Sequence, residues 1–387
     1  MTRAFPDPIV RSYSVKANDV PAVIAAVASN GFGANVVSRG EWAQATRAGV
    51  PNERTTLEGV GKTTADLRAA ARAAAAGQPL RWIAIESPEE AAVLAEEATR
   101  ARAPRLDVLY RLNPDVAPET LMGLAVGAGG TKFGMTETEI AAAIDAGGGP
   151  DGPLRPRGIH LHVGSQLGAV DAWRDAVRKA LALAGLWRGS IATFDTVDLG
   201  GGFPVGPAGE PAPSPERFAR ELGPLLEGVP EDRRPQRLAV EPGRVLVARA
   251  GWLVARVLHV RDRAGRQVVL DAGMTELIRP ALYGARHPIL ALTSLGRPVD
   301  GLEGGGRTRD LAPARVEGPI CESTDSLGTH DLPPLRRGDL VAIADAGAYG
   351  ASLGSTYNGR PRPPQILLGT DGAMSVGRRR GSLASLA

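Results

Sequence analysis

The feature that most constrains the fold of this chain is a regular alternation of short apolar segments with helix-like segments between residues 9 and 243. The apolar segments predict strands at Ile9–Val15, Ala34–Val37, Thr55–Val60, Trp82–Ile85, Leu106–Leu112, Gly158–Val163, Thr196–Leu199 and Leu238–Val240. Helical patterns between them lie at Val20–Ser29, Thr64–Ala76, Pro88–Ala101, Thr136–Ala146 and Ala172–Leu186. Strands that alternate with helices form a parallel sheet, and eight units over roughly 240 residues match a (β/α)8 barrel of the TIM type. An open, doubly wound sheet is the alternative that this pattern leaves.

The pattern changes after Arg244, where helical periodicity fades and β-rich segments alternate with Gly/Pro turns. The expected strands are Leu253–Val260, Gln267–Asp271, Leu340–Ala344 and Gln365–Leu368. The glycine-rich segment Gly301–Arg309 is expected to be an exposed loop. The sequence therefore predicts two domains, a barrel over residues 1–245 and a mostly antiparallel β domain over residues 246–387.

Composition excludes several classes of protein. The net charge is +3 over 387 residues, and no basic cluster is interleaved with aromatic residues, so nucleic acid is not an expected partner. Cys321 is the single cysteine, which excludes an internal disulfide and fits a reducing compartment. No secretory signal and no apolar run of membrane-spanning length is present, so we expect a cytoplasmic protein without a membrane partner.

Reactive residue types fall at four of the eight predicted strand ends, where a barrel carries its catalytic groups. These are Lys16, His162, the triplet Gly200-Gly201-Gly202, and Glu241-Pro242-Gly243-Arg244. Only Lys16, Lys62, Lys132 and Lys179 are lysines among 45 basic residues, and a desolvated lysine differs from arginine in that it can attack a carbonyl as a free amine. Glycines after a strand let backbone N–H groups approach an anion closely.

A lysine, a phosphate cup, a flat imidazole and a carboxylate are together what pyridoxal 5'-phosphate (PLP) requires. Each residue also has a structural interpretation. Lys16 could extend to solvent from the strand end, His162 could be a core histidine, and Glu241 could cap a helix or pair with a cation.

Several motifs resemble the fold-type III PLP-dependent decarboxylases, and most closely the diaminopimelate decarboxylases, over about residues 9–370. They are Tyr13–Asn18 (YSVKAN), His162–Gln166 (HVGSQ), Leu199–Phe203 (LGGGF), Glu241–Arg244 (EPGR), Asp271–Met274, Arg279–Gly284, Gly318–Asp325, Gly347–Gly350 and Tyr357-Asn358. The resemblance implies decarboxylation of a diamino acid, with meso-diaminopimelate converted to L-lysine as the first choice. Other amino acids of the ornithine, lysine, arginine or carrier-bound kind are the alternative substrates.

The resemblance also implies a role for individual residues. Lys16 would carry the cofactor covalently, His162 would stack on its ring, and Glu241 would pair with the ring nitrogen. The phosphate would be held by Ser165, Gly201, Gly202, Gly243 and Arg244. Arg244, Arg279 and Tyr283 would bind the distal carboxylate of the substrate, and Tyr349 would contact both cofactor and substrate. In a head-to-tail homodimer with shared active sites, Cys321 of the second subunit would protonate the substrate carbanion and Glu322 would bind the distal amine.

The chain departs from the family pattern at several places. Only fifteen residues precede Lys16, where relatives usually have some tens that include a strand of the β domain, so either the start is truncated or another segment covers that sheet edge. Thr324 stands where glycine is usual, and Gln365 stands where glutamate is common.

Three rival functions remain at this point. A racemase of the same architecture would place arginine at the ring nitrogen, so Glu241 argues against it. A non-catalytic PLP-binding protein would lack residues 246–370, and a catalytically defective relative stays open. No metal is expected, because His259, His287 and His330 lack metal-ligand spacing, and His160 is assigned a structural role. Gly59–Thr64 resembles a P-loop in part but has Thr56 at the position of the first glycine, so no nucleotide site is expected there.

Overall fold

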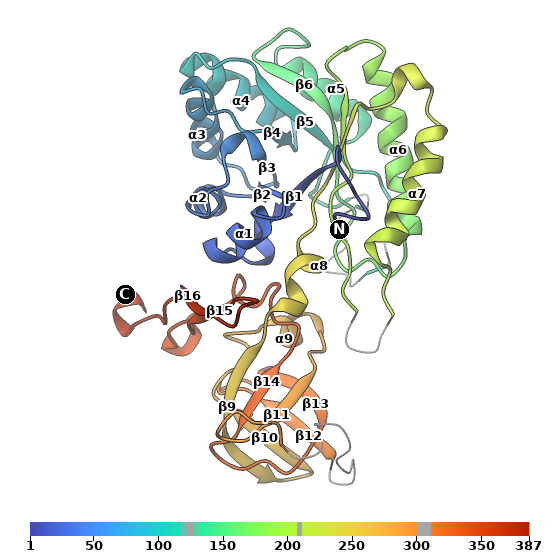
Figure 1. Cartoon of the computed structure of the whole chain (residues 1–387). Coiled ribbons are helices and arrows are strands. Elements are labelled where there is room, and N and C mark those ends of the chain that lie inside the picture. Colours follow the sequence, from blue (N-terminus) through green and yellow to red (C-terminus); the bar gives the residue numbers. More distant parts are fainter. Residues whose placement is uncertain (118, 121–126, 129, 207–210, 300–310, 387) are drawn as a thin grey trace. The chain divides into compact units, whose positions relative to one another are not determined.

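The computed structural model describes residues 1–117, 119–120, 127–128, 130–206, 211–299 and 311–386. The chain divides into two compact units (Figure 1). The first comprises Met1–Val205 and Ala212–Val245, and the second comprises Leu246–Ala387 together with Gly206–Pro211. No described helix has both the length and the apolar character needed to cross a membrane.

The first unit is a closed barrel of parallel strands, as the sequence predicts. Its strands are β1 (Val10–Ser14), β2 (Gly33–Val36), β3 (Thr55–Leu57), β4 (Trp82–Ile85), β5 (Leu106–Leu112), β6 (Leu154–Leu161), β7 (Thr196–Asp198) and β8 (Arg237–Val240). Each strand pairs with the next along the chain, and β1 also pairs with β8 through Val10 opposite Ala239 and Arg11 opposite Val240. This last pairing closes the barrel and excludes the open doubly wound sheet. The strands are short and almost wholly buried, as expected where helices cover a parallel sheet.

The helices of the barrel are α1 (Pro21–Ala28), α2 (Arg39–Arg47), α3 (Thr64–Ala75), α4 (Pro88–Ala101), α5 (Glu137–Ala146), α6 (Asp171–Arg188), α7 (Pro215–Glu227) and the four-residue α8 (Arg244–Val247). Four of them begin at a capping hydroxyl, since the side chains of Ser38, Thr63, Ser87 and Thr136 each accept an N–H of the first helical turn. A cap of this kind stabilises a helix by about 1 kcal/mol. Helices α2 and α7 were not among the predicted helices.

Two predicted strand boundaries were wrong. The expected strand Thr55–Val60 ends at Leu57, so Glu58 to Val60 lie in the loop that follows β3, and Val60 is exposed. The expected strand Gly158–Val163 begins four residues earlier, at Leu154, and ends at Leu161. In both cases the prediction extended the strand to a later apolar residue, Val60 or Val163, past the residue at which the backbone stops pairing.

The second unit is built on a six-stranded sheet of order β11-β14-β9-β10-β12-β13 and a separate β15–β16 pair. The strands are β9 (Leu253–Asp262), β10 (Arg266–Leu270), β11 (Ile289–Leu292), β12 (Ala312–Glu317), β13 (Ser326–Leu332), β14 (Leu340–Ile343), β15 (Gln365–Leu368) and β16 (Met374–Arg378). Among the strand pairs that the structure describes in this sheet, only β10 and β12 pair in parallel, so the sheet is mostly antiparallel, as predicted. The predicted loop Gly301–Arg309 lies outside the described residues.

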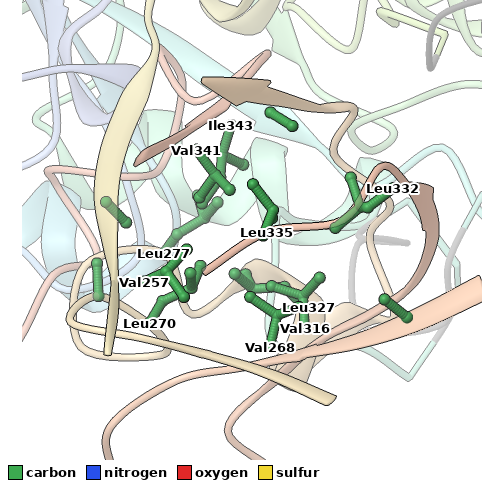
Figure 2. Close-up of a cluster of buried hydrophobic side chains, with 14 residues drawn as sticks. Val257, Val268, Leu270, Leu277, Val316, Leu327, Leu332, Leu335, Val341 and Ile343 are labelled. Carbon is green, nitrogen blue, oxygen red and sulfur yellow. The ribbon is translucent and has the colours of Figure 1, made fainter. Parts of the chain in front are cut away.

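Apolar side chains from several strands of this sheet pack into one core (Figure 2). Val257, Val268 and Leu270 come from β9 and β10, and they gather with residues of β12, β13 and β14. Short helical segments within the described residues of the two units are α9 (Arg279–Tyr283), η1 (Val15–Ala17), η2 (Asn52–Arg54), η4 (Glu231–Arg233), η5 (Ala248–Ala250), η7 (Tyr357–Gly359) and η8 (Leu383–Leu386).

Gly158 provides a test of barrel packing. Its φ is +152°, and a Cβ atom at this position would lie 1.7 Å from the carbonyl oxygen of Thr196 on β7. We expect Gly158→Ala to lower the free energy of unfolding by about 3 kcal/mol or more, because β6 and β7 would have to separate. Calorimetric unfolding of the whole chain measures the effect.

Gly185→Ala is the matched control for that variant. Gly185 lies within α6, and an added Cβ would meet Arg233 Cβ at an ordinary 3.5 Å. This substitution should leave stability unchanged or raise it by up to about 1 kcal/mol, through helix propensity. Equal unfolding temperatures for the two variants would contradict the packing described for Gly158.

Candidate active site

Lys16 lies directly after β1, within the 3₁₀ turn η1, and its side chain is half-buried. Two hydrogen bonds tie this strand end to the end of β8. Ser14 N–H donates to Pro242 O at 3.2 Å, and the Ser14 hydroxyl donates to Glu241 O at 3.0 Å. Gly243 completes the junction, since a Cβ there would lie 3.0 Å from Ser14 Cβ. Lys16 and Glu241 are therefore held at neighbouring strand ends.

Two glycines of the triplet after β7, Gly200 and Gly201, lie beside the imidazole of His162. Gly201 N–H donates to His162 Nδ1 at 3.1 Å, which makes Nδ1 an acceptor and fixes the neutral tautomer with hydrogen on Nε2. Burial, together with the positive charge of Lys16, holds the pKa of His162 well below its usual value. Gly200 has φ +68°, and a Cβ there would lie 2.2 Å from Leu161 O. Only glycine fits this approach of β7 to the end of β6.

The loops after β6 and β7 are joined to each other. The side chain of Gln166 donates to Val205 O at 3.0 Å and accepts Val205 N–H at 2.8 Å. Leu167 N–H donates to Gly202 O at 3.2 Å. Beside this junction, Arg244 Nη2 donates to Ser165 Oγ at 3.1 Å, which brings the loops after β6 and β8 together. The predicted phosphate-binding residues thus lie on adjoining loops, with a hydroxyl, backbone N–H groups and a guanidinium as donors.

Glu241 is only 3% exposed, and two other buried carboxyl groups accompany it. Glu58 follows β3 and Asp198 ends β7, and His160 of β6 lies among them. His160 Nε2 is 3.2 Å from Glu241 Oε1 and 3.4 Å from Glu58 Oε2. Burial raises the pKa of Glu241, although hydrogen bonds from Glu58 and Asp198 and the charge of Lys16 act in the opposite direction.

Sequence reasoning missed Glu58 and Asp198 and gave His160 a structural role. A signal was available for both acids, because each stands at the carboxyl end of a barrel strand. Glu58 was hidden because the predicted strand extended to Val60. A further buried pair lies nearby, in which Arg111 donates to Glu86 at 2.5 Å.

Apart from Arg244, which lies in the first unit, the predicted substrate residues lie in the second unit. Arg279 is 8% exposed, and its Nη1 is 3.1 Å from Nε2 of the buried His287. His287 Nδ1 is 2.9 Å from Ala344 O, so Nδ1 donates to this carbonyl and Nε2 accepts from Arg279. Tyr283 ends the same short helix that Arg279 begins, and Tyr349 has a left-handed φ of +58°. Both tyrosines are half-buried.

Cys321 and Glu322 lie exposed in the loop between β12 and β13. Glu322 accepts a hydrogen bond from the hydroxyl of Tyr357 at 2.6 Å and another from Thr324 Oγ1 at 3.2 Å. The base of the loop is held by the buried carboxylate of Asp325, which accepts the N–H groups of Met274 at 2.6 Å and Ile320 at 2.7 Å. Thr324, the departure from the family pattern, therefore contacts Glu322 directly.

Comparison with known proteins agrees with this geometry. The sequence model of the family described as "Pyridoxal-dependent decarboxylase, pyridoxal binding domain" matches residues 1–248. The diaminopimelate decarboxylase of Aquifex aeolicus is 33% identical over 387 residues, covering 98% of this chain and 84% of that protein. The diaminopimelate decarboxylase of Deinococcus radiodurans is 35% identical over 378 residues, covering 94% of this chain and 85% of that protein.

Solved structures give the same result. The crystal structure of diaminopimelate decarboxylase from Helicobacter pylori complexed with L-lysine superposes with a TM-score of 0.87 at 29% identity, covering 100% of this chain and 91% of that one. The lysine/ornithine decarboxylase from Vibrio vulnificus complexed with putrescine has a TM-score of 0.74 at 22% identity, covering 93% of this chain and 88% of that one, and shows the fold alone. The chain belongs to the fold-type III pyridoxal-dependent decarboxylase family, which includes the diaminopimelate decarboxylases that it matches over nearly its whole length.

Proposed function

We propose that this protein decarboxylates meso-diaminopimelate to L-lysine with PLP as its cofactor. The observation that carries the proposal is the pairing of β1 with β8, which holds Lys16 and the buried carboxyl of Glu241 at neighbouring strand ends. The choice of substrate is supported by the diaminopimelate decarboxylases, which resemble this chain across both of its units.

The residues at this end of the barrel fit PLP. Lys16 supplies an amine for covalent attachment, and the neutral imidazole of His162 offers a flat face for the ring. Ser165, Gly202, Gly243 and Arg244 supply hydroxyl, backbone and guanidinium donors for the phosphate. Gly201 stays a prediction in that role, because its N–H donates to His162. The bound cofactor supplies an electron sink for the bond that breaks when the substrate carboxylate leaves as CO2.

Glu241 determines the type of reaction. A carboxylate beside the ring nitrogen stabilises the proton on that nitrogen and favours acceptance of the electron pair. A racemase would instead place arginine there to restrain this acceptance. Glu241 lies at the neighbouring strand end to Lys16, and it is buried away from bulk water. These observations favour decarboxylation over racemisation.

The second unit supplies the groups that select the substrate. We assign Arg279 and Tyr283, together with Arg244, to the distal carboxylate of the substrate, and Glu322 to its distal amine. Cys321 would return a proton to the carbon that loses CO2, and Tyr349 would contact both cofactor and substrate. Arg244 and Arg279 are buried cations, and buried cations that bind the second carboxylate discriminate against substrates that lack it. Cys321 and Glu322 would serve the barrel of a partner subunit in a homodimer.

Replacement of Lys16 tests the cofactor and the reaction together. Lys16→Ala should abolish both the absorbance of covalently bound PLP and CO2 release from meso-diaminopimelate, because no other amine would be available at the strand end. Lys132→Ala is the matched control, since Lys132 lies over the Phe133 ring and has no assigned chemistry. Full activity in Lys16→Ala would refute the site. If the wild-type protein showed the absorbance of covalently bound PLP but released CO2 from ornithine and not from meso-diaminopimelate, the substrate assignment would change.

Mixing two inactive variants tests the shared site. Lys16→Ala and Cys321→Ala should each be inactive, and after subunit exchange their mixture should recover up to about a quarter of wild-type activity, because half of the mixed dimers' sites are intact. Sedimentation analysis of the same samples measures the dimer. A mixture that stays inactive although exchange is demonstrated with tagged subunits would mean that each chain forms its own site.

His287 tests how Arg279 is positioned. His287→Phe keeps the volume of a ring but removes the acceptor for the Arg279 guanidinium, so we expect KM for meso-diaminopimelate to rise about 10-fold or more with a smaller change in kcat. His287→Gln retains an acceptor and should restore part of the affinity. A fall in kcat at unchanged KM in both variants would contradict an effect through Arg279.

A further inference from the structure

At the carboxyl ends of its strands, the barrel holds an unusual number of buried polar groups. Glu58 is 3% exposed, Asp198 is 0% exposed and Glu241 is 3% exposed. His160 and Asn35 are also buried, at 1% and 2% exposure. These residues come from the ends of β2, β3, β6, β7 and β8, so the barrel itself brings them together. We call them the carboxyl cluster: Asn35, Glu58, His160, Asp198 and Glu241.

Contacts within the cluster centre on Glu58. Asn35 Nδ2 donates to Glu58 Oε2 at 2.8 Å, and His160 Nε2 lies 3.4 Å from the same oxygen. One carboxylate oxygen of Glu58, one carboxylate oxygen of Glu241 and one ring nitrogen of His160 all lie within 4.8 Å of one another. Asp198 accepts the N–H of Gly200 at 3.0 Å and also shares a hydrogen bond with Glu241.

The charges around the cluster cannot balance three carboxylates. Lys16 is the amine that acts on both Glu58 and Glu241. Arg111 also acts on Glu241 through its charge, but its guanidinium is paired with the carboxylate of Glu86 at 2.5 Å. Burial lowers the pKa of His160 to about 4, so its ring contributes no positive charge at neutral pH. Two or three uncompensated anions in a dry interior would cost several kcal/mol each, so the cluster must hold protons.

We propose that Glu58 is a protonated carboxylic acid at neutral pH, and that it donates a hydrogen bond to Glu241 and thereby keeps Glu241 the ionised carboxylate of the cluster. Glu58 is thus a positioning residue that acts through Glu241. The placement of Glu241 at the cofactor nitrogen rests on the proposed function, whereas the protonation of Glu58 does not.

The directions of the pKa shifts agree with this geometry. Burial, followed by the charge of Glu241, raises the pKa of Glu58 to about 8. Burial and the charge of Glu241 likewise raise the pKa of Asp198 well above its usual value. A hydrogen bond donated to a carboxylate favours its ionised form, so the hydrogen bonds that Glu241 shares with Glu58 and Asp198 oppose the effect of burial on its pKa. Asn35 adds a donor to Glu58 Oε2 without adding a further charge.

Infrared spectroscopy of the cofactor-free protein tests the protonation directly. At pH 7 we expect the carbonyl band of a buried carboxylic acid in the wild type, and we expect Glu58→Gln to remove one such band. Glu97→Gln is the matched control, since Glu97 is also 3% exposed but is paired with Arg68 and Arg100 and has a lowered pKa. If Glu58→Gln removed none of these carbonyl bands, the proposal would be overturned.

Unfolding of the cofactor-free protein gives a second readout. An acid whose pKa is raised on folding stabilises the folded state less as the pH rises, because the unfolded chain releases the proton first. The quantity to compare is the free energy of unfolding of the wild type minus that of Glu58→Gln. This difference should fall between about pH 4.5, the pKa of an unfolded glutamate, and about pH 8, the pKa of folded Glu58, and should stay constant above pH 8. A difference in unfolding temperature that is independent of pH would contradict a protonated Glu58.

The action on Glu241 is tested with PLP bound. Glu58→Gln retains a neutral donor and should keep the pH at which the bound cofactor's absorbance titrates, with kcat within about 3-fold of the wild type. Glu58→Leu removes the donor, so it should shift that titration and lower kcat about 10-fold or more. An unmoved titration in Glu58→Leu would show that Glu58 does not act through Glu241. If neither variant nor wild type released CO2, the proposed function would fail while the infrared result still decided the protonation.

A bound cation is the other explanation of such a cluster. Elemental analysis of the dialysed wild-type protein should find less than one equivalent of any divalent metal. A stoichiometric metal that is lost in Glu58→Gln would overturn the proposal, because the carboxyls would then be ionised ligands.

Discussion

The pairing of β1 with β8 is the constraint on which the site depends. Strand closure is a property of the barrel as a whole, yet its immediate effect is local, because the first strand of the barrel pairs with the eighth at residues 10–11 and 239–240. Ser14 then bonds to the backbone of both Glu241 and Pro242. An amine and a carboxyl separated by more than two hundred residues are thereby fixed on one rigid junction, without any contact between their own side chains being needed to place them.

The barrel interior has an apolar part and a polar part. Trp82, Leu109 and Ala239 form a buried apolar cluster, whereas the carboxyl ends of the strands carry the carboxyl cluster and His162. Burial of so many ionisable groups does not favour folding. The apolar strands, the covering helices and the capped helix starts must offset this cost, and the arrangement is typical of sites where function is maintained against stability.

The sequence predicted the barrel well because short apolar strands and capped helices are local patterns. Lys16, His162 and Glu241 could be placed at strand ends for the same reason. Glu58 was missed, because the predicted strand Thr55–Val60 runs past the end of β3 at Leu57 and so places Glu58 inside a strand. The role of His160 depends on its distances to Glu58 and Glu241, which only the closed barrel determines. Similarly, the partnership of Arg279 with His287 arises from a turn of the chain between residues eight apart, and helical or strand periodicity does not encode it.

Asp325 has a consequence for how this fold can change its specificity. Its buried carboxylate receives two backbone N–H groups and sits against Gly273 and Gly318, so the base of the loop is set by main-chain contacts. The tip, Cys321 to Thr324, is exposed, and it meets Asp325 through the main chain, where the Asp325 N–H donates to Glu322 O at 3.1 Å. A backbone contact of this kind does not depend on which side chain stands at position 322. Anchor and tip are therefore separable. A lineage, or a protein engineer, can exchange the tip to suit amino acids of other lengths while the anchor keeps the loop in register with the sheet.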